Sequence, residues 1–109
     1  MSFPDLFSLD GQTVLITGAS RGLGRAMAVA LSEAGADLVL SSRSLEGTDE
    51  TARLARQNGV NAHQIPADLT SEEEAARLAV QAIVEAGPIE VLVNAAGITA
   101  RARAEKYDR

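Results

Sequence analysis

The stretch TGASRGLG at residues 17–24 decides the fold that we expect for this chain. A β-branched apolar run at 12–17 precedes it, and such a run is typical of a strand buried on both faces of a sheet. The segment at 23–34 follows it, is rich in alanine and leucine, and ends at Gly35, a residue suited to the left-handed position after a helix. The sequence therefore predicts a strand and a helix joined by a turn that contains three glycines.

The spacing of these glycines, G-x-x-x-G-x-G, indicates what the turn can hold. Gly18 allows the tight turn out of the strand, Gly22 leaves room for a pyrophosphate against the backbone, and Gly24 lets the helix pack closely on the sheet. Free N–H groups and the positive end of the helix macrodipole would then meet the phosphate charge. No Gly-Lys-Ser/Thr follows the turn, which excludes a Walker-type loop. Glycines that only turn the strand into the helix are the weaker alternative, because context and spacing both fit a phosphate site.

The rest of the chain repeats the alternation of strand and helix. Its pattern predicts strands at 37–41, 60–67 and 89–93, a helix at 48–58, and a helix from a Thr70–Glu73 capping box to Gly87. This alternation is typical of an α/β fold with a Rossmann-type parallel sheet and helices on both faces. Pro66 cannot donate to a sheet ladder, so we expect the third strand at an edge and the strand order 3-2-1-4. The switch point between strands one and four is then the expected ligand site.

The helix after Thr70 is predicted to turn one apolar face toward the core. That face consists of Ala75, Leu78, Ala79, Ala82, Ile83 and Ala86. The glutamates at 72–74 fit the dipole of a helix N-terminus better than a metal site. His63 lies in the middle of the third predicted strand, where a position on the strand surface is favoured over a role as a base.

Composition excludes several classes of protein. The chain has 109 residues, 46% of them hydrophobic, which suits a single domain spanning residues 1–109. It has no cysteine, which excludes disulfides and thiolate metal sites, and no apolar run long enough to span a membrane. A formal net charge of -5 and only 3% aromatic residues argue against nucleic-acid binding. We therefore expect a cytoplasmic protein with no metal, membrane or nucleic-acid partner.

Two further motifs, taken with TGASRGLG, make the chain similar to the short-chain dehydrogenase/reductase family. NAAG at 94–97 matches the family's motif at the end of strand four, and Asp68-Leu69 matches the acid that follows strand three. Either motif alone is weak, but all three in order at the ends of the expected strands are specific. The resemblance implies that NAAG lines the nicotinamide side of a dinucleotide cofactor and that Asp68 contacts its adenine. The residues expected to bind the cofactor are Gly18, Ser20, Arg21, Gly22, Leu23, Gly24, Ser42, Arg43, Asp68, Leu69, Asn94, Ala95, Ala96 and Gly97.

Charge at the end of the second strand favours NADP(H) over NAD(H). An NAD site needs an acid there to accept hydrogen bonds from the ribose hydroxyls, whereas a 2′-phosphate needs a cation. Ser42 stands in that place, Arg43 follows it, and Arg21 adds a second cation from the glycine-rich turn. Arginine suits a phosphate because it can bond two oxygens at once. Glu46 is the rival ribose ligand, and an ordinary solvated position is the alternative for Arg43.

The resemblance also implies a reaction, namely hydride transfer between the nicotinamide ring and a carbonyl or alcohol group of a small-molecule substrate. The family's catalytic serine and Tyr-x-x-x-Lys pair lie beyond NAAG, and Tyr107 stands too close to Gly97 to be that tyrosine. We therefore assign no catalytic residue and expect an NADP-dependent oxidoreductase that lacks its C-terminal catalytic half and is inactive alone. The alternative is a non-catalytic nucleotide-binding or interaction module. The apolar edge strand at 89–93 further predicts a homo-oligomer.

Overall fold

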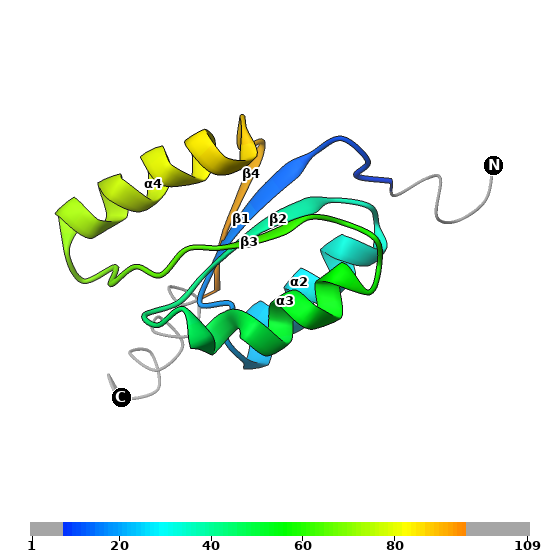
Figure 1. The fold of residues 1–109 in the computed structure, drawn as a ribbon, viewed down its shortest axis with the longest axis horizontal. Coiled ribbons are helices and arrows are strands. Elements are labelled where there is room, and N and C mark those ends of the chain that lie inside the picture. The colour runs from blue at the N-terminus through cyan, green and yellow to red at the C-terminus, as the bar shows by residue number, and fades with distance from the viewer. Residues whose placement is uncertain (1–7, 96–109) are drawn as a thin grey trace, which may run out of the picture.

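The structure is a computed structural model that describes residues 8–95 (Figure 1). Its elements, in chain order, are β1 (Thr13–Thr17), α2 (Gly22–Glu33), β2 (Asp37–Ser41), the 3-10 helix η1 (Glu46–Thr48), α3 (Asp49–Arg56), β3 (Ala62–Gln64), α4 (Glu72–Ala86) and β4 (Val91–Asn94). Strands and helices alternate along the chain, as the sequence predicts. Within the described range, every helix is too short or too polar to cross a membrane.

The four strands form one parallel sheet in the order β3-β2-β1-β4. The predicted order 3-2-1-4 is confirmed, with β3 at one edge. At the carboxyl end of the sheet, Thr17 of β1 lies level with Ser41 of β2 and Asn94 of β4. Because these strands are parallel, the segments that follow them leave the sheet along the same edge.

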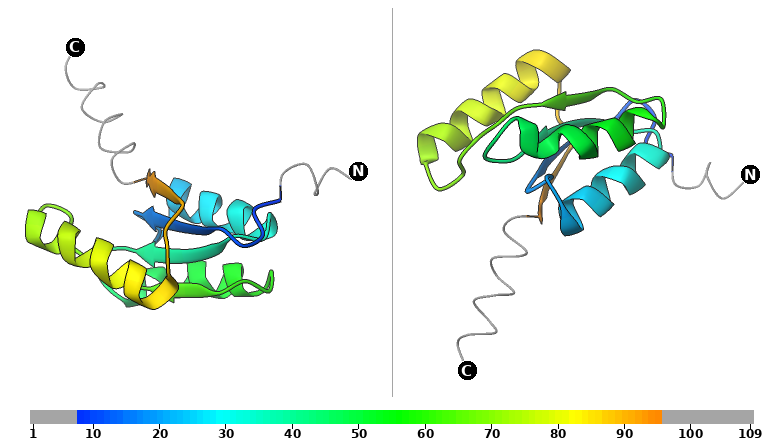
Figure 2. Two further views of the ribbon diagram at one scale, coloured as in Figure 1. Left: turned by 90° about the horizontal axis from the view of Figure 1, so that it is seen from above. Right: turned by 60° about the horizontal axis from the view of Figure 1, so that its bottom comes forward.

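Helices cover both faces of this sheet, α2 and α3 on one side and α4 on the other (Figure 1 and both views of Figure 2). Successive side chains of β1 point to opposite faces. Val14 and Ile16 pack with residues of α2 and α3, whereas Leu15 packs with Leu78 of α4. Each of these three β1 residues is buried, so β1 is the centre of two apolar layers. The predicted strand buried on both faces is confirmed.

The third strand is shorter than predicted, because it ends at Gln64. The chain continues beside β2 beyond it, since Ile65 N–H donates to the Leu40 carbonyl at 3.0 Å and Ala67 N–H donates to the Ser42 carbonyl at 2.8 Å. Pro66 stands between these two donors, where a backbone N–H of an edge strand would face away from the sheet. The missing donor of proline therefore costs no sheet hydrogen bond.

Helix α4 begins one residue later than the predicted capping box. The Ser71 hydroxyl accepts a hydrogen bond from Glu74 N–H at 3.3 Å and is the N-cap. The Thr70 hydroxyl instead donates to the Asp68 carboxylate at 2.7 Å. The prediction of a Thr70–Glu73 box was wrong, because a neighbouring carboxylate engages the threonine and leaves serine to cap the helix.

The buried face of α4 is also narrower than predicted. Leu78 and Ala82 are buried and Ala86 is half-buried. The other three predicted core residues, Ala75, Ala79 and Ile83, are exposed. Within residues 8–95, α4 alone covers this side of the sheet, so only the stripe that touches β1 and β2 is buried.

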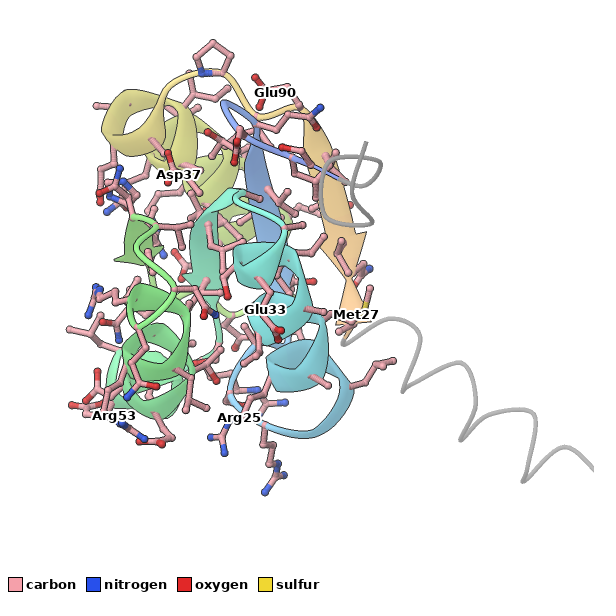
Figure 3. The ribbon with its side chains drawn as sticks, turned by 90° about the vertical axis from the view of Figure 1, so that its right-hand side faces the viewer. Arg25, Met27, Glu33, Asp37, Arg53 and Glu90 are labelled. Carbon is pink, nitrogen blue, oxygen red and sulfur yellow. The ribbon has the colours of Figure 1, made fainter. Side chains whose placement is uncertain are left out.

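Strand β4 is fastened to β1 at its start. Glu90 N–H donates to the Thr13 carbonyl at 3.0 Å, and the Glu90 carboxylate accepts from Thr13 N–H at 2.7 Å. Figure 3 shows Glu90 at this end of the sheet. On the far side of β4 no other strand pairs with it in the described range, and 64% of Leu92 is exposed.

Replacement of Gly24 by alanine is expected to destabilise the fold strongly. A Cβ at this position would lie 1.9 Å from the Gly18 carbonyl oxygen, which is backbone and cannot rotate away. We expect Gly24→Ala to lower the free energy of unfolding in urea by roughly 3 kcal/mol or more. Gly59→Ala is the control, because Gly59 has a φ of +82° but open space around it, so about 1 kcal/mol is expected. Equal losses in the two variants would contradict the close packing of α2 on β1.

Candidate functional site

A cleft of about 1170 Å³ lies at the carboxyl ends of β1, β2 and β4. The predicted switch point between strands one and four, where a ligand is expected, lies here. Eleven of the fourteen predicted binding residues line it, namely Gly18, Ser20, Arg21, Gly22, Leu23, Gly24, Ser42, Arg43, Leu69, Asn94 and Ala95. Asp68 lies beside the cleft, and the predicted residues Ala96 and Gly97 fall outside the part of the chain that the structure describes.

The glycine-rich turn forms one wall of the cleft. Gly18 and Gly22 have φ values of +69° and +58°, which L side chains rarely adopt. A Cβ built on Gly22 would meet no atom within 4 Å, so this residue faces open space in the cleft. Gly24, in contrast, is buried against the Gly18 carbonyl. The turn thus presents bare backbone and the N-terminus of α2 to the cleft, a geometry that suits an anion.

A tight turn after β2 also lines the cleft. The Ser42 hydroxyl donates to the Ser44 carbonyl at 2.7 Å, and Gly47 N–H donates to the Ser44 hydroxyl at 3.2 Å. A Cβ on Gly47 would lie 2.7 Å from the Ser42 hydroxyl, so a larger residue here would require the Ser42 side chain to move. Arg43 lines the cleft from this turn, and Arg21 lines it from the glycine-rich turn. The two turns therefore bring two cations and several hydroxyls to the cleft.

The Asp68 carboxylate is held in its charged form by its neighbours. The Thr70 hydroxyl donates to it at 2.7 Å and Thr70 N–H donates to it at 3.0 Å. These two hydrogen bonds, followed by the positive charge of Arg43, hold the pKa of Asp68 below its usual range. Asp68 is exposed, and Leu69 and Thr70 after it reach the cleft. The Asp68-Leu69 pair thus lies at the rim, with only its second residue in the wall.

A hydrogen bond joins the ends of β1 and β4 at the floor of the cleft. The Thr17 hydroxyl donates to the Asn94 side-chain oxygen at 2.9 Å, and it lies 3.4 Å from the Val93 carbonyl. Thr17 is buried. The first residue of the glycine motif and the first residue of NAAG are therefore in direct contact.

Sequence reasoning missed five residues that line the cleft. They are Ser41, Ser44, Gly47, Ala67 and Thr70. All five follow or end a strand on the carboxyl side of the sheet, and that position was the available signal. Ser41 also carries a buried side-chain oxygen that lacks a hydrogen-bond partner within residues 8–95.

The remaining predicted assignments lie away from the cleft. His63 stands on β3 with its Nδ1 3.8 Å from a carboxylate oxygen of Glu85 on α4, as expected for a strand surface residue. The glutamates at 72–74 form the first turn of α4, as the dipole argument predicts. In the described part of the chain, no group of three or more acidic, histidine or cysteine residues is placed to hold a metal ion.

Removal of the Thr70 hydroxyl is expected to raise the pKa of Asp68. Thr70→Val loses the strongest hydrogen bond to the carboxylate, so the pKa should move up toward the ordinary value, whereas Thr70→Ser should keep it low. Carboxyl carbon chemical shifts followed against pH would measure both. Because the folded-state pKa is lowered, the stabilisation is present above the unfolded pKa of about 3.9 and is lost as pH falls through the folded value. Identical titration curves in wild type and Thr70→Val would contradict the assignment.

Comparisons with known proteins agree on one group of enzymes. The family described as short chain dehydrogenase matches residues 12–109. Gluconate 5-dehydrogenase of Gluconobacter oxydans is 42% identical over 110 residues, an alignment that covers 100% of this chain and 43% of that protein. The chain thus spans less than half the length of this relative.

Two solved structures have the same fold as this chain. The RhlG/NADP active-site complex of Pseudomonas aeruginosa is 39% identical with a TM-score of 0.76, covering 85% of this chain and 37% of that one. A short-chain type dehydrogenase/reductase of Mycobacterium marinum is 35% identical with a TM-score of 0.78, covering 84% and 37%.

Proposed function

The chain belongs to the short-chain dehydrogenase family, and on that premise we propose that it is the NADP(H)-binding part of an oxidoreductase. When bound, the cofactor would supply or accept a hydride, exchanged with a carbonyl or alcohol carbon of a small-molecule substrate. The observation that carries the proposal is the cleft lined by the glycine-rich turn, which contributes Arg21, and by the turn after β2, which contributes Arg43.

The residues of the cleft fit a dinucleotide with three phosphates. Gly22 leaves open space beside the backbone of the turn, where a diphosphate can approach the N–H groups and the N-terminus of α2. Arg21 and Arg43, with the Ser42 hydroxyl, would hold a further phosphate at the end of β2. At the other end of the cleft, Asn94 and Ala95 would border the nicotinamide.

The preference for NADP(H) over NAD(H) rests on the charge after β2. No acid follows Ser41 in the turn that lines the cleft, where Ser42, Arg43 and Ser44 stand in sequence. Glu46, the rival ligand for the ribose, is exposed on η1 and is not among the residues that line the cleft. A carboxylate in the wall would repel a 2′-phosphate, so the fact that Glu46 does not line the cleft supports NADP(H).

Arg43→Ala is expected to weaken binding of NADPH more than binding of NADH. The loss of hydrogen bonds from a charged group to the 2′-phosphate should raise the dissociation constant for NADPH by about 10- to 100-fold. Titration of cofactor fluorescence would measure both cofactors. Arg53→Ala on the exposed face of α3 is the control, since its partner is Glu50 and it does not line the cleft.

Two outcomes would overturn the choice of cofactor. If Arg43→Ala weakens NADH and NADPH equally, Arg43 does not read the 2′-phosphate. If the wild-type protein binds NADH more tightly than NADPH, the preference is wrong, although the family assignment stands.

The second candidate is a nucleotide-binding or interaction module without catalysis. It is kept because these 109 residues contain no complete Tyr-x-x-x-Lys pair. Both candidates require NADPH binding. They differ in whether the protein at its natural length oxidises NADPH when a small aldehyde or ketone is added, and such oxidation would exclude the module.

Association through β4 and a cytoplasmic location complete the proposal. Val91 and Leu92 make this edge of β4 apolar and exposed, and no further strand covers it within the described range, so another copy of the chain can pack against it.

A chain of these 109 residues, produced as such, is expected to self-associate through β4. Leu92→Lys should shift it toward monomer, because a charge on an edge strand opposes pairing. Val84→Lys is the matched control, since Val84 is 78% exposed but lies on α4 rather than on a strand edge. Sedimentation velocity over a range of concentrations would report the species. A wild-type chain that remains monomeric at high concentration would refute the expectation.

A further inference from the structure

Two side chains that do not line the cleft, those of Arg25 and Thr51, form hydrogen bonds with backbone carbonyls of the glycine-rich turn. The Thr51 hydroxyl on α3 donates to the Ala19 carbonyl at 2.7 Å and accepts from Nε of Arg25 at 3.1 Å. Arg25, at the start of α2, also donates from Nη2 to the Ser20 carbonyl at 2.6 Å. Thr51 has no exposed surface and Arg25 is half-buried. Figure 3 shows Arg25 on α2 beside α3.

These contacts fix the direction in which two peptide units point. In a planar trans peptide, the carbonyl and the following N–H point in opposite directions. The carbonyl of Ala19 points toward α3, so Ser20 N–H points away from α3. The carbonyl of Ser20 points toward the Arg25 guanidinium, so Arg21 N–H points away from that group. Ser20 and Arg21 both line the cleft.

We propose that Arg25 and Thr51 are positioning residues for the diphosphate part of the cofactor. They act through the carbonyls of Ala19 and Ser20, and they do not line the cleft themselves. Their effect is to turn carbonyl oxygens, which repel an anion, away from the phosphates and to present N–H groups instead. The inference rests on the proposed function, because it takes the occupant of the turn to be a dinucleotide.

Threonine at position 51 is suited to this role because its hydroxyl is donor and acceptor at once. It donates to Ala19 and accepts from Arg25, so one atom links the turn, α2 and α3. Thr51→Val has nearly the same shape and loses both bonds, whereas Thr51→Ser retains both. Comparison of the two variants therefore distinguishes the effect of the hydroxyl on cofactor binding from the effect of side-chain packing.

A matched control exists on the neighbouring 3-10 helix. Thr48 is also buried, and its hydroxyl donates to the Leu45 carbonyl at 3.2 Å and accepts from Gln64 at 3.0 Å. These hydrogen bonds do not involve the glycine-rich turn, and Thr48 does not line the cleft. Thr48→Val thus loses a comparable buried hydroxyl, and it should lower the melting temperature to a similar degree without changing affinity for NADH.

The test compares three ligands: NADPH, NADH, and 2′-AMP, which carries the 2′-phosphate but no diphosphate. Calorimetric titration below the melting temperature of every variant gives each dissociation constant. We expect Thr51→Val to weaken NADPH and NADH alike, by about 5- to 100-fold, because an anion loses one or two oriented donors. Affinity for 2′-AMP should stay within about twofold of wild type, which is near the error of such differences. Thr51→Ser should bind all three ligands like wild type.

Arg25→Lys supplies a second route to the same answer if Thr51→Val does not fold. It keeps the positive charge but cannot bridge Thr51 and the Ser20 carbonyl with one planar group, so it should show the same ligand pattern. The inference is overturned if the variants bind the dinucleotides like wild type. It is also overturned if they lose 2′-AMP to the same degree, which would indicate a general structural role. If wild type binds neither NADPH nor NADH, the proposed function itself fails.

Discussion

The rest of the structure depends on the close approach of α2 to β1 at the glycine-rich turn. Position 24 has no room for a single additional carbon, because the Gly18 carbonyl occupies that space. This contact sets the depth at which α2 sits on the sheet, and Val14, Ile16 and Ala28 meet in the core that results. It also brings the N-terminus of α2 to the carboxyl end of β1, where the cleft opens. Packing and anion binding therefore follow from the same missing side chain.

Local patterns in the sequence were enough for the order of elements and for the sheet. Pro66 correctly indicated the edge strand, and Gly35 has the positive φ expected after a helix, at +98°. The errors came from competition between neighbours. Thr70 and Ser71 are both suitable N-cap residues. The Thr70 hydroxyl bonds to the Asp68 carboxylate, so Ser71 caps the helix, and a helix pattern in the sequence does not reveal such a bond.

The cleft shows the same division between local and distant information. The three glycine positions, Ser42 and Arg43 could be predicted from motifs and charge alone. Gly47 could not, because it reaches the cleft only after the chain beyond Ser42 turns back on itself. The contacts between Arg25 and Thr51 were equally hidden, since they join two helices whose relative position depends on the whole layer. The prediction of which α4 residues are buried was partly wrong for a related reason. Periodicity predicts an apolar face of a helix, but not how much of that face a neighbouring element covers.

The hydrogen bond between Thr17 and Asn94 has a consequence for the order of folding. It joins residues 77 positions apart, as does the pairing of Thr13 with Glu90. Closure of so long a loop carries a larger entropic cost than formation of the β1–β2 contacts, so we expect β4 to dock after β1 and β2 have paired. Most of the phosphate-binding wall is made by the first half of the chain, whereas Asn94 and Ala95 join it with β4. In a growing polypeptide, the residues that line the proposed phosphate site would then be in place before Asn94 joins the cleft. A nucleotide that favours the completed cleft would stabilise the docked β4 by mass action.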